Sequence, residues 1–534
     1  MRSQSGQKGS QYRVGSVELN HRERQILFWA SFLALMTAGF GFAFRVAKMG
    51  DYGTHLELTN LQNGQIFGAT LWPIAVTMIL FSLIVDRTGY KVPMYIAFVL
   101  QTSAGLGTAL SNSYGSLYFT GLCAGLGHGI IEAVINPVCA AVYPRNKTKM
   151  LTVLHAAWPA GLVGGTLIIL LTDAIAGEDG LSWKVHALWI LLPAVAYAIL
   201  FFPCRFPVDE RVRAGVPYVE MLRQVGFLGA SLASFMLIYE FGNQASQLGG
   251  FSLGPNWFWI SLVAGIVAGG IFGTAVKALG KPVFFLMCLL MIPLATAEVG
   301  TDQWIKKLMS PVLEGIKIDP AFSLVFSAAI MLVFRVFAGG ILKFFTPPSL
   351  LCVSGLFSAV GLLWLSEASG AVVFVAFVIY ALGQTYYWPC VLGFVSERYP
   401  RGGALTLNTV SALGLLSVGI IGGQLLGVAF DKSEHAGVKK EIPVVAEVAE
   451  DDKSFLGVSY TAIIPEKFNK WMEEQPPDVQ ADTKATYATI QGQAGRDVLA
   501  FAVWFPSILF VVFGMIWLYF RSQGGYKQIH LEYK

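Results

Sequence analysis

Long apolar runs follow one another along most of the chain and are separated by short polar stretches. A helix needs about 20 mostly apolar residues to cross a bilayer. Fourteen runs meet this requirement, at 27–46, 66–85, 92–110, 117–143, 151–172, 185–203, 224–241, 257–276, 282–300, 321–342, 348–366, 371–395, 404–428 and 498–520. The pattern predicts an all-α integral membrane protein with fourteen spans.

The basic residues predict how these spans are oriented. With the N-terminus inside, 22 of the 37 Lys and Arg residues fall in inside segments and 6 in the short outside loops. Because basic residues favour the cytoplasmic side, we expect a multi-pass protein of the cytoplasmic (inner) membrane with both termini in the cytoplasm. The composition agrees, since 55% hydrophobic and 13% charged residues exclude a soluble globule. A net charge of +4 gives no indication of a nucleic-acid partner.

The chain also contains an internal repeat with an offset of 256 residues. Leu126 and Gly127 precede a Tyr-Pro-Arg string at 143–145, and Leu382 and Gly383 precede the same string at 399–401. The repeat predicts two six-span halves with pseudo-two-fold symmetry. The runs at 224–241 and 257–276 have no counterpart and are interpreted as an extra hairpin between the halves.

The repeat and the loops give the expected domain boundaries. The predicted parts are a cytoplasmic N-tail 1–26, a first bundle 27–203, a linker with the hairpin 204–281, a second bundle 282–520 and a cytoplasmic C-tail 521–534. The loop 431–497 is expected outside as a soluble cap, with a short helix near Lys467 to Glu474.

Duplicated multi-span halves are typical of transporters, whose binding site lies near the bilayer midplane between the repeats. The chain has no GxxxxGK[ST] string, so an ATP-driven pump is excluded. No catalytic constellation or metal-ligand spacing is present, and the six Cys lie in or beside apolar runs. We therefore expect a monomeric transporter in the lipid bilayer that is not an enzyme and uses no cofactor or metal.

The loop after the second span contains Asp86, Arg87, Gly89 and Lys91. A positive-inside loop with a Gly turn would explain these residues, but their order also resembles the cytoplasmic signature of the major facilitator superfamily. The resemblance implies that the Asp caps a helix end and pairs with an Arg in a latch between the bundles. Ser82 stands where the signature usually has its first Gly.

Within that superfamily, three stretches resemble the fucose/galactose/glucose–proton symporter group. They are 58–66 before the second span, 125–137 in the fourth span, and 335–339 in the run at 321–342. The resemblance covers the twelve repeated spans but not the hairpin 224–276 or the loop 431–497. It implies sugar transport coupled to an ion.

Glu132 is a carboxylate in the middle of an apolar run, where an acid marks a proton, ion or substrate site by default. His128 and Asn136 lie four residues before and after it, so the three side chains share one helix face. We expect this stripe to face a central cavity. A hydrogen-bond network that only joins helices is the alternative.

The repeat places Gln384 and Trp388 opposite His128 and Glu132. Sugar sites combine hydrogen-bonding groups with flat aromatic faces, so these two residues and the neighbouring Tyr387 are candidates for the same site. Packing or interfacial positions are the common alternative for membrane aromatics.

Three further charged residues are candidates. Arg45 stands near the position where the resembled group has its proton-linked Asp, and it is either a snorkelling anchor or a guanidinium that binds an acidic solute. Glu298, near the outer end of the ninth run, is either part of the site or a loop-edge charge. Arg335 lies inside a span, as in the resembled group, and is expected to form a structural pair near the cytoplasmic gate. His155, Trp158 and Asn408 are weaker cavity candidates.

The residues and the resemblance together predict a secondary active transporter that moves a small polar solute, a sugar above all, by alternating access. Without an acid in the first span, coupling to H⁺ or Na⁺ would use Glu132 or Glu298, or be absent. Two alternatives stay open: a transporter of an organic anion or drug, and a sensor or scaffold that has lost transport.

Overall fold

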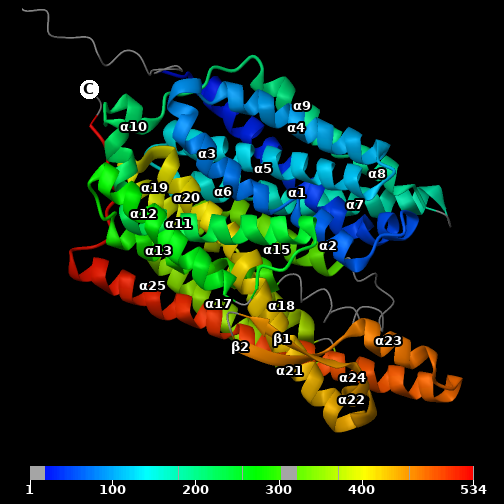
Figure 1. Cartoon of the computed structure of the whole chain (residues 1–534). Helices are drawn as coiled ribbons and strands as arrows, with labels where there is room; N and C mark the ends of the chain where they lie inside the picture. The colour runs from blue at the N-terminus through cyan, green and yellow to red at the C-terminus, as the bar shows by residue number, and fades with distance from the viewer. Residues whose placement is uncertain are drawn as a thin grey trace, which may run out of the picture.

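In a computed structural model the chain forms a bundle of long helices with a small α/β unit at one end (Figure 1). The structure describes residues 18–177, 180–254, 256–301, 322–370, 372–455 and 458–532. The first and last helices, α1 (His21–His55) and α25 (Trp504–Ser522), begin and end at the same face of the bundle, here called the termini face. The opposite end, with the α/β unit, is called the cap face.

The first half consists of helices that cross between these faces, several of them in two pieces. Its other elements are α2 (Asn60–Gly68), α3 (Trp72–Thr88), α4 (Lys91–Leu110), α5 (Tyr114–Val142), α6 (Lys147–Leu154), α7 (Ala157–Ala176), α8 (Trp183–Leu188) and α9 (Leu191–Phe201). A linker with α10 (Glu210–Arg213) leads to the hairpin of α11 (Tyr218–Gly249) and α12 (Trp257–Val276).

The second half repeats this plan and contains more irregular turns. Its elements are α13 (Pro282–Ala295), η1 (Thr296–Gly300), α15 (Phe322–Val336), α16 (Ala338–Ile341), α17 (Pro347–Glu367), α18 (Val372–Gln384), α19 (Tyr387–Arg398), η2 (Pro400–Gly402), α20 (Gly403–Ser417), η3 (Val418–Gly422), α21 (Gly423–Glu441), α24 (Pro477–Ala502) and α25. Both η1 and η3 are single π-helical turns.

Each of the fourteen apolar runs contains a helix, and twelve helices in the described residues are long and apolar enough to cross a membrane. The two runs outside this set are those of α4 and α15. The 20-residue helix α4 includes Lys91 and several small polar residues, and α15 directly follows the segment 302–321, which lies outside the described residues. The count of fourteen spans therefore stays a prediction.

Close backbone contacts hold neighbouring helices together. A carbon built at the Cβ position of Gly39 in α1 would lie 2.4 Å from the carbonyl oxygen of Trp158, and one at Gly161 in α7 would lie 2.3 Å from that of Met36. Only glycine allows this approach. Between membrane helices, where lipid removes the hydrophobic driving force, such small-residue contacts provide the packing energy.

The two ends of the α11–α12 hairpin lie side by side where they join the bundle. Phe227 and Leu228 donate backbone hydrogen bonds to Ala278 and Leu279, each at 3.0 Å. Gly226 makes this crossing possible because its φ is 55° and a Cβ there would lie 2.1 Å from the backbone nitrogen of Gly280. The hairpin is therefore anchored to the bundle by its own backbone.

The loop 431–497 forms a folded cap. The end of α21, α22 (Pro443–Ala449), an antiparallel pair β1 (Glu450–Phe455) and β2 (Val458–Ile463), α23 (Pro465–Glu473) and the start of α24 surround a small apolar core. The short helix expected near Lys467 is α23. The all-α expectation holds for the bundle, but the cap adds the strand pair, since β2 alternates polar residues with β-branched and aromatic ones.

Candidate functional site

Arg335 lies where helices of both halves are interrupted by proline. Pro159 in α7 and Pro389 in α19 have no backbone N–H, so the carbonyl groups of His155 and Thr385, four residues earlier, lack a helical donor. Arg335 supplies both donors: Nε bonds the Thr385 oxygen at 2.7 Å, and Nη1 bonds the His155 oxygen at 3.1 Å. Because His155 belongs to the first half and Thr385 to the second, one guanidinium joins the two halves.

Glu298 completes the coordination of this guanidinium. Nη2 of Arg335 donates to Oε1 of Glu298 at 2.7 Å, and the two side chains are 2% and 10% exposed. Glu298 lies in the π-helical turn η1, a type of turn that is frequent at functional sites. Glu298 is thus a buried ion-pair partner and not a loop-edge charge. Arg335 forms a buried pair with Glu298, and its expected role near the cytoplasmic gate stays a prediction.

The predicted stripe on α5 is buried next to this ion pair. Asn136 donates from Nδ2 to Oε2 of Glu132 at 2.7 Å, and its Oδ1 lies 3.0 Å from Nε2 of His155. Since Oδ1 can only accept, His155 is assigned the tautomer with its proton on Nε2. His128 Nε2 lies 3.9 Å from the other Glu132 oxygen. The structure therefore joins Glu132, Asn136 and His155 in one hydrogen-bonded cluster, with His128 beside it.

His155 connects the cluster of Glu132 with the ion pair of Arg335, through its ring on one side and its carbonyl group on the other. With neutral histidines, two carboxylates face one guanidinium, so the buried group has one negative charge in excess. Burying an unbalanced charge is costly.

A second contact between the halves lies closer to the termini face. Asn408 in α20 donates from Nδ2 to Oγ of Ser82 at 2.7 Å and to the carbonyl oxygen of Ala133 at 3.0 Å. This carbonyl lacks its helical donor because Pro137 follows four residues later. Ser82, the residue that departs from the resembled signature, therefore has a partner in the other half.

Arg45 turns its guanidinium toward the centre of the bundle. A Cβ built at Gly41, one turn earlier in α1, would lie 3.3 Å from Nη1 of Arg45. The guanidinium lines a cavity of about 20 Å³ with His128 and Trp158, whose rings stack with centroids 5.3 Å apart. Among the residues described, Arg45 makes no hydrogen bond or ion pair. This inward direction does not fit a snorkelling anchor.

The three candidates of the second half lie around its own helices. Gln384 donates to Oγ of Ser327 at 3.2 Å, and the hydroxyl group of Tyr387 donates to the carbonyl oxygen of Ser354 at 3.4 Å. Trp388 is 8% exposed and packs against Gly414. These hydrogen bonds of Gln384 and Tyr387 lie within the second half, and the role of the two residues in binding stays a prediction.

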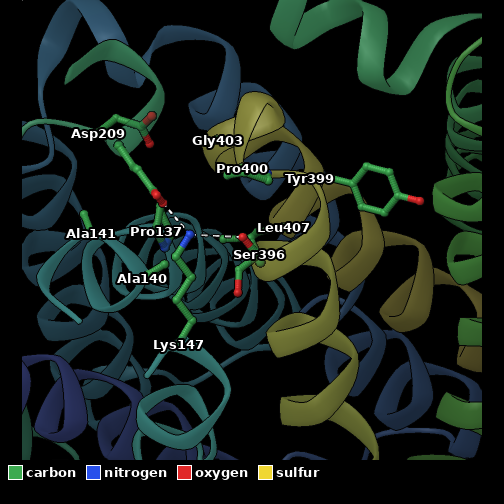
Figure 2. Close-up of a pocket in the computed structure, with 11 residues that line it drawn as sticks. Pro137, Ala140, Ala141, Lys147, Asp209, Ser396, Tyr399, Pro400, Gly403 and Leu407 are labelled. Carbon is green, nitrogen blue, oxygen red and sulfur yellow. Dashed lines mark hydrogen bonds and ion pairs between the residues drawn. The ribbon is translucent and has the colours of Figure 1, made fainter. Parts of the chain in front are cut away.

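On the termini face a group of polar residues closes the gap between the halves. Lys147 at the start of α6 reaches Oε2 of Glu210 at 2.5 Å and the carbonyl oxygen of Ser396 at 3.1 Å (Figure 2). Beside it, the backbone N–H and the hydroxyl group of Thr148 both donate to Oε1 of Glu397, at 3.2 and 2.5 Å. We call Lys147, Thr148, Glu210, Ser396 and Glu397 the latch.

The signature loop lies next to the latch. Asp86 forms an ion pair with Arg211 of α10, and Gly89 takes the turn with a φ of 69°. The hydroxyl group of Tyr90 donates to Oδ2 of Asp209 at 2.8 Å. Burial and the charge of Asp209 raise the pKa of Tyr90 well above its ordinary value, so this hydroxyl group stays a donor. Lys91 donates to the carbonyl oxygen of Phe202 at 2.8 Å.

The structure is thus closed on the termini face and hollow toward the cap face. A cavity of about 630 Å³ lies between α2 and α3 of the first half, α11 of the hairpin, and α20 to α21 of the second half. Leu71 lines both this cavity and the small cavity at Arg45. A solute site between the halves would be reached from the cap face in this conformation.

The latch residues and Arg211 are not among the candidates predicted from the sequence. Their signal was the string of charges at 209–213, between two apolar stretches of the linker. His155 and Asn408 were only weaker candidates, yet both connect the halves. His155 offers its own carbonyl group, freed by Pro159, to Arg335, and Asn408 donates to the carbonyl group of Ala133, freed by Pro137. Only the fold brings these partners together.

Comparison with known proteins identifies the family of the chain. The sequence model of the Major Facilitator Superfamily matches residues 27–423. The hexuronate transporter of Bacillus subtilis (strain 168) is 26% identical over 149 residues, which cover 28% of this chain and 34% of that protein. The match therefore spans about a third of the curated relative.

Two solved structures with the same fold are sugar symporters. The proton:xylose symporter XylE from E. coli superposes with a TM-score of 0.59 at 13% identity, covering 96% of this chain and 99% of that one. A single-residue variant of the E. coli fucose:proton symporter FucP gives a TM-score of 0.51 at 13% identity, covering 92% and 98%. The chain belongs to the major facilitator superfamily and is a membrane transporter of a small solute, not an enzyme.

Proposed function

We propose that this protein is a secondary active transporter that moves a sugar together with a proton across the cytoplasmic membrane, with both termini in the cytoplasm. The observation on which this proposal rests is the buried cluster of Glu132, Asn136 and His155 joined to the Arg335–Glu298 pair of the other half. Sugar:proton symporters among the proteins of the same fold, and the excess of basic residues in the inside segments, support it.

Protonation of this cluster would be coupled to the movement of the halves. While the halves meet at Arg335, His155 keeps its carbonyl group on the guanidinium and its ring on Asn136. Separation of the halves on the termini face would break the first bond and expose Glu132 and Glu298 to a different solvent compartment. A proton taken up from one side would then leave to the other, together with the solute.

The test uses purified protein in proteoliposomes with an internal pH dye. Addition of a transported sugar outside, without an imposed gradient, is expected to acidify the lumen as protons enter with the sugar. A rate of sugar uptake that changes with neither a pH gradient nor a Na⁺ gradient would exclude symport. Binding of a sugar without counterflow would instead indicate the sensor or scaffold.

Arg45 supports a second candidate, a transporter of an acidic sugar or another organic anion. Its guanidinium lies beside His128 and Trp158 and has no partner among the described residues. The hexuronate transporter is a relative whose name denotes such a solute. Uptake of labelled glucose should be measured in competition with glucuronate for the wild type, Arg45→Lys and Arg45→Gln. If the solute is acidic, glucuronate competes at least tenfold better than neutral sugars and only Arg45→Gln loses this preference.

A further inference from the structure

The extra hairpin is part of the path between the halves. Its helix α11 contacts the first half at both ends: the hydroxyl group of Tyr218 donates to the carbonyl oxygen of Leu83 at 2.9 Å, and Nε2 of Gln65 donates to the carbonyl oxygen of Gln247 at 3.3 Å. On its other side α11 packs against α13 and α20 of the second half (Figure 1). The helix therefore covers the junction between the halves along one side of the bundle.

Toward the cap face, α11 has a continuous polar stripe. Glu240, Asn243, Gln244 and Gln247 lie at positions i, i+3, i+4 and i+7, so they share one helix face, and all four line the 630 Å³ cavity. A polar stripe on a membrane helix is costly when it faces lipid. Because this stripe faces a cavity between the halves, it makes one wall of that cavity polar.

Several hydrogen-bonding groups in this cavity lack protein partners. Gln244 donates to Glu240 at 2.8 Å, whereas the side-chain amides of Asn243 in α11 and Gln424 in α21 make no hydrogen bond within the part of the chain that the structure describes. Trp72 adds an aromatic ring, held edge to face against Phe241. Amides of α11 and α21 and an aromatic ring of α3 that line one cavity suit a solute with many hydroxyl groups.

The charges of the residues that line this cavity favour a neutral solute over an anionic one. Glu240 is the one charged residue among those that the structure places around this cavity, and no basic residue accompanies it. An anionic solute would be repelled here, whereas a neutral polyhydroxyl solute can bond both donors and acceptors. The volume of 630 Å³ lies within the range of sites for small molecules.

We infer that α11 forms one wall of an outer vestibule in which a neutral polyhydroxyl solute, a sugar or polyol, binds before it passes Leu71 toward the Glu132 cluster. The inference rests on the proposed function for the identity of the solute. It gives the extra hairpin, which has no counterpart in the repeat, a direct part in solute recognition.

The test combines labelling with transport in proteoliposomes containing the full chain. Asn243→Cys should react with a membrane-impermeant maleimide, and glucose, galactose, fucose or xylose should slow this reaction at least fivefold. The matched control is Ser252→Cys in the connection between α11 and α12, an exposed position at the cap-face end of the hairpin that does not line the cavity. Its labelling rate should not respond to sugars. For uptake, Asn243→Leu and Gln244→Leu are expected to raise KM about tenfold each, as the loss of one good hydrogen bond would, with the maximal rate retained.

The outcomes separate this inference from the proposed function. An unreactive Asn243→Cys would show that the stripe does not face water, and the vestibule would be refuted. Labelling without protection by a sugar that the wild type transports, or an unchanged KM in both Leu variants, would refute solute binding at α11 while leaving transport intact. If the wild type transports none of the sugars but one of them still protects Asn243→Cys, the vestibule is supported and the proposed function fails.

Discussion

Arg335 of the second half donates a hydrogen bond from Nη1 to the carbonyl oxygen of His155 in the first half, at 3.1 Å. The same guanidinium bonds Thr385 and Glu298. Two prolines and one π-helical turn provide these acceptors, so irregularities in three helices converge on one cation. This relationship accounts for the isolated Arg in an apolar span.

Arg335→Ala should be strongly destabilising because it leaves the Glu298 carboxylate buried without its partner. Breaking a buried pair in this way typically costs about 3 to 5 kcal/mol. The double variant Arg335→Ala with Glu298→Ala should recover a large part of this loss. Thermal unfolding in detergent measures the effect, and a double variant whose unfolding temperature falls further than that of Arg335→Ala would contradict the pairing.

Variants of Asn408 and Pro137 test whether Asn408 replaces the helical donor that the Ala133 carbonyl group lacks. Asn408→Ala leaves the Ala133 carbonyl oxygen buried and without a donor, a loss of about 1 to 3 kcal/mol. Pro137→Ala restores a backbone N–H that can donate to that oxygen. We therefore expect the double variant to be more stable than Asn408→Ala alone. Strictly additive losses in a double-mutant cycle would show that Asn408 acts through Ser82 instead.

The latch should respond to pH through Glu210. Burial raises the pKa of Glu210 above its ordinary value of 4.5, and the ammonium group of Lys147 opposes this shift. A carboxyl whose pKa is higher in the folded state stabilises the fold fully below its unfolded pKa, and this stabilisation is lost as pH rises through the folded pKa. Adjacent Asp209 adds to the shift.

For the wild type, the contribution of Glu210 to the unfolding temperature should therefore fall as pH rises above about 4.5. Glu210→Gln cannot titrate and should remove this part of the pH dependence. The difference between the two unfolding curves from pH 4 to pH 7 isolates the contribution of Glu210. A difference that stays constant over this range would show that the Glu210 carboxyl does not titrate with a shifted pKa.

The sequence was sufficient to predict a helical membrane protein of the major facilitator fold, because hydrophobic runs and a 256-residue repeat are local or periodic signals. It also identified Glu132, since a carboxylate in an apolar run is conspicuous without any structure. It did not pair Glu298 with Arg335 or Asp86 with Arg211, because these contacts depend on how separate helices pack against one another. The Lys147–Glu210 contact had no signal beyond a charged linker.

The polar stripe on α11 shows what a helical period can and cannot reveal. Glu240, Asn243, Gln244 and Gln247 could be placed on one face from their spacing alone. Whether that face meets lipid, another helix or a cavity depends on how the hairpin packs against both halves. The strands of the cap were missed for a different reason, since charged residues around β1 hide a short exposed hairpin.

The central claim is that Glu132 couples solute movement to a proton. The most direct test compares net sugar accumulation with sugar exchange in the same variants. In proteoliposomes with an inward proton gradient, the wild type and the control Glu367→Gln, an exposed carboxyl at the end of α17, should accumulate sugar. Glu132→Gln should lose accumulation and keep sugar exchange at equal concentrations. Undiminished accumulation by Glu132→Gln would contradict the account.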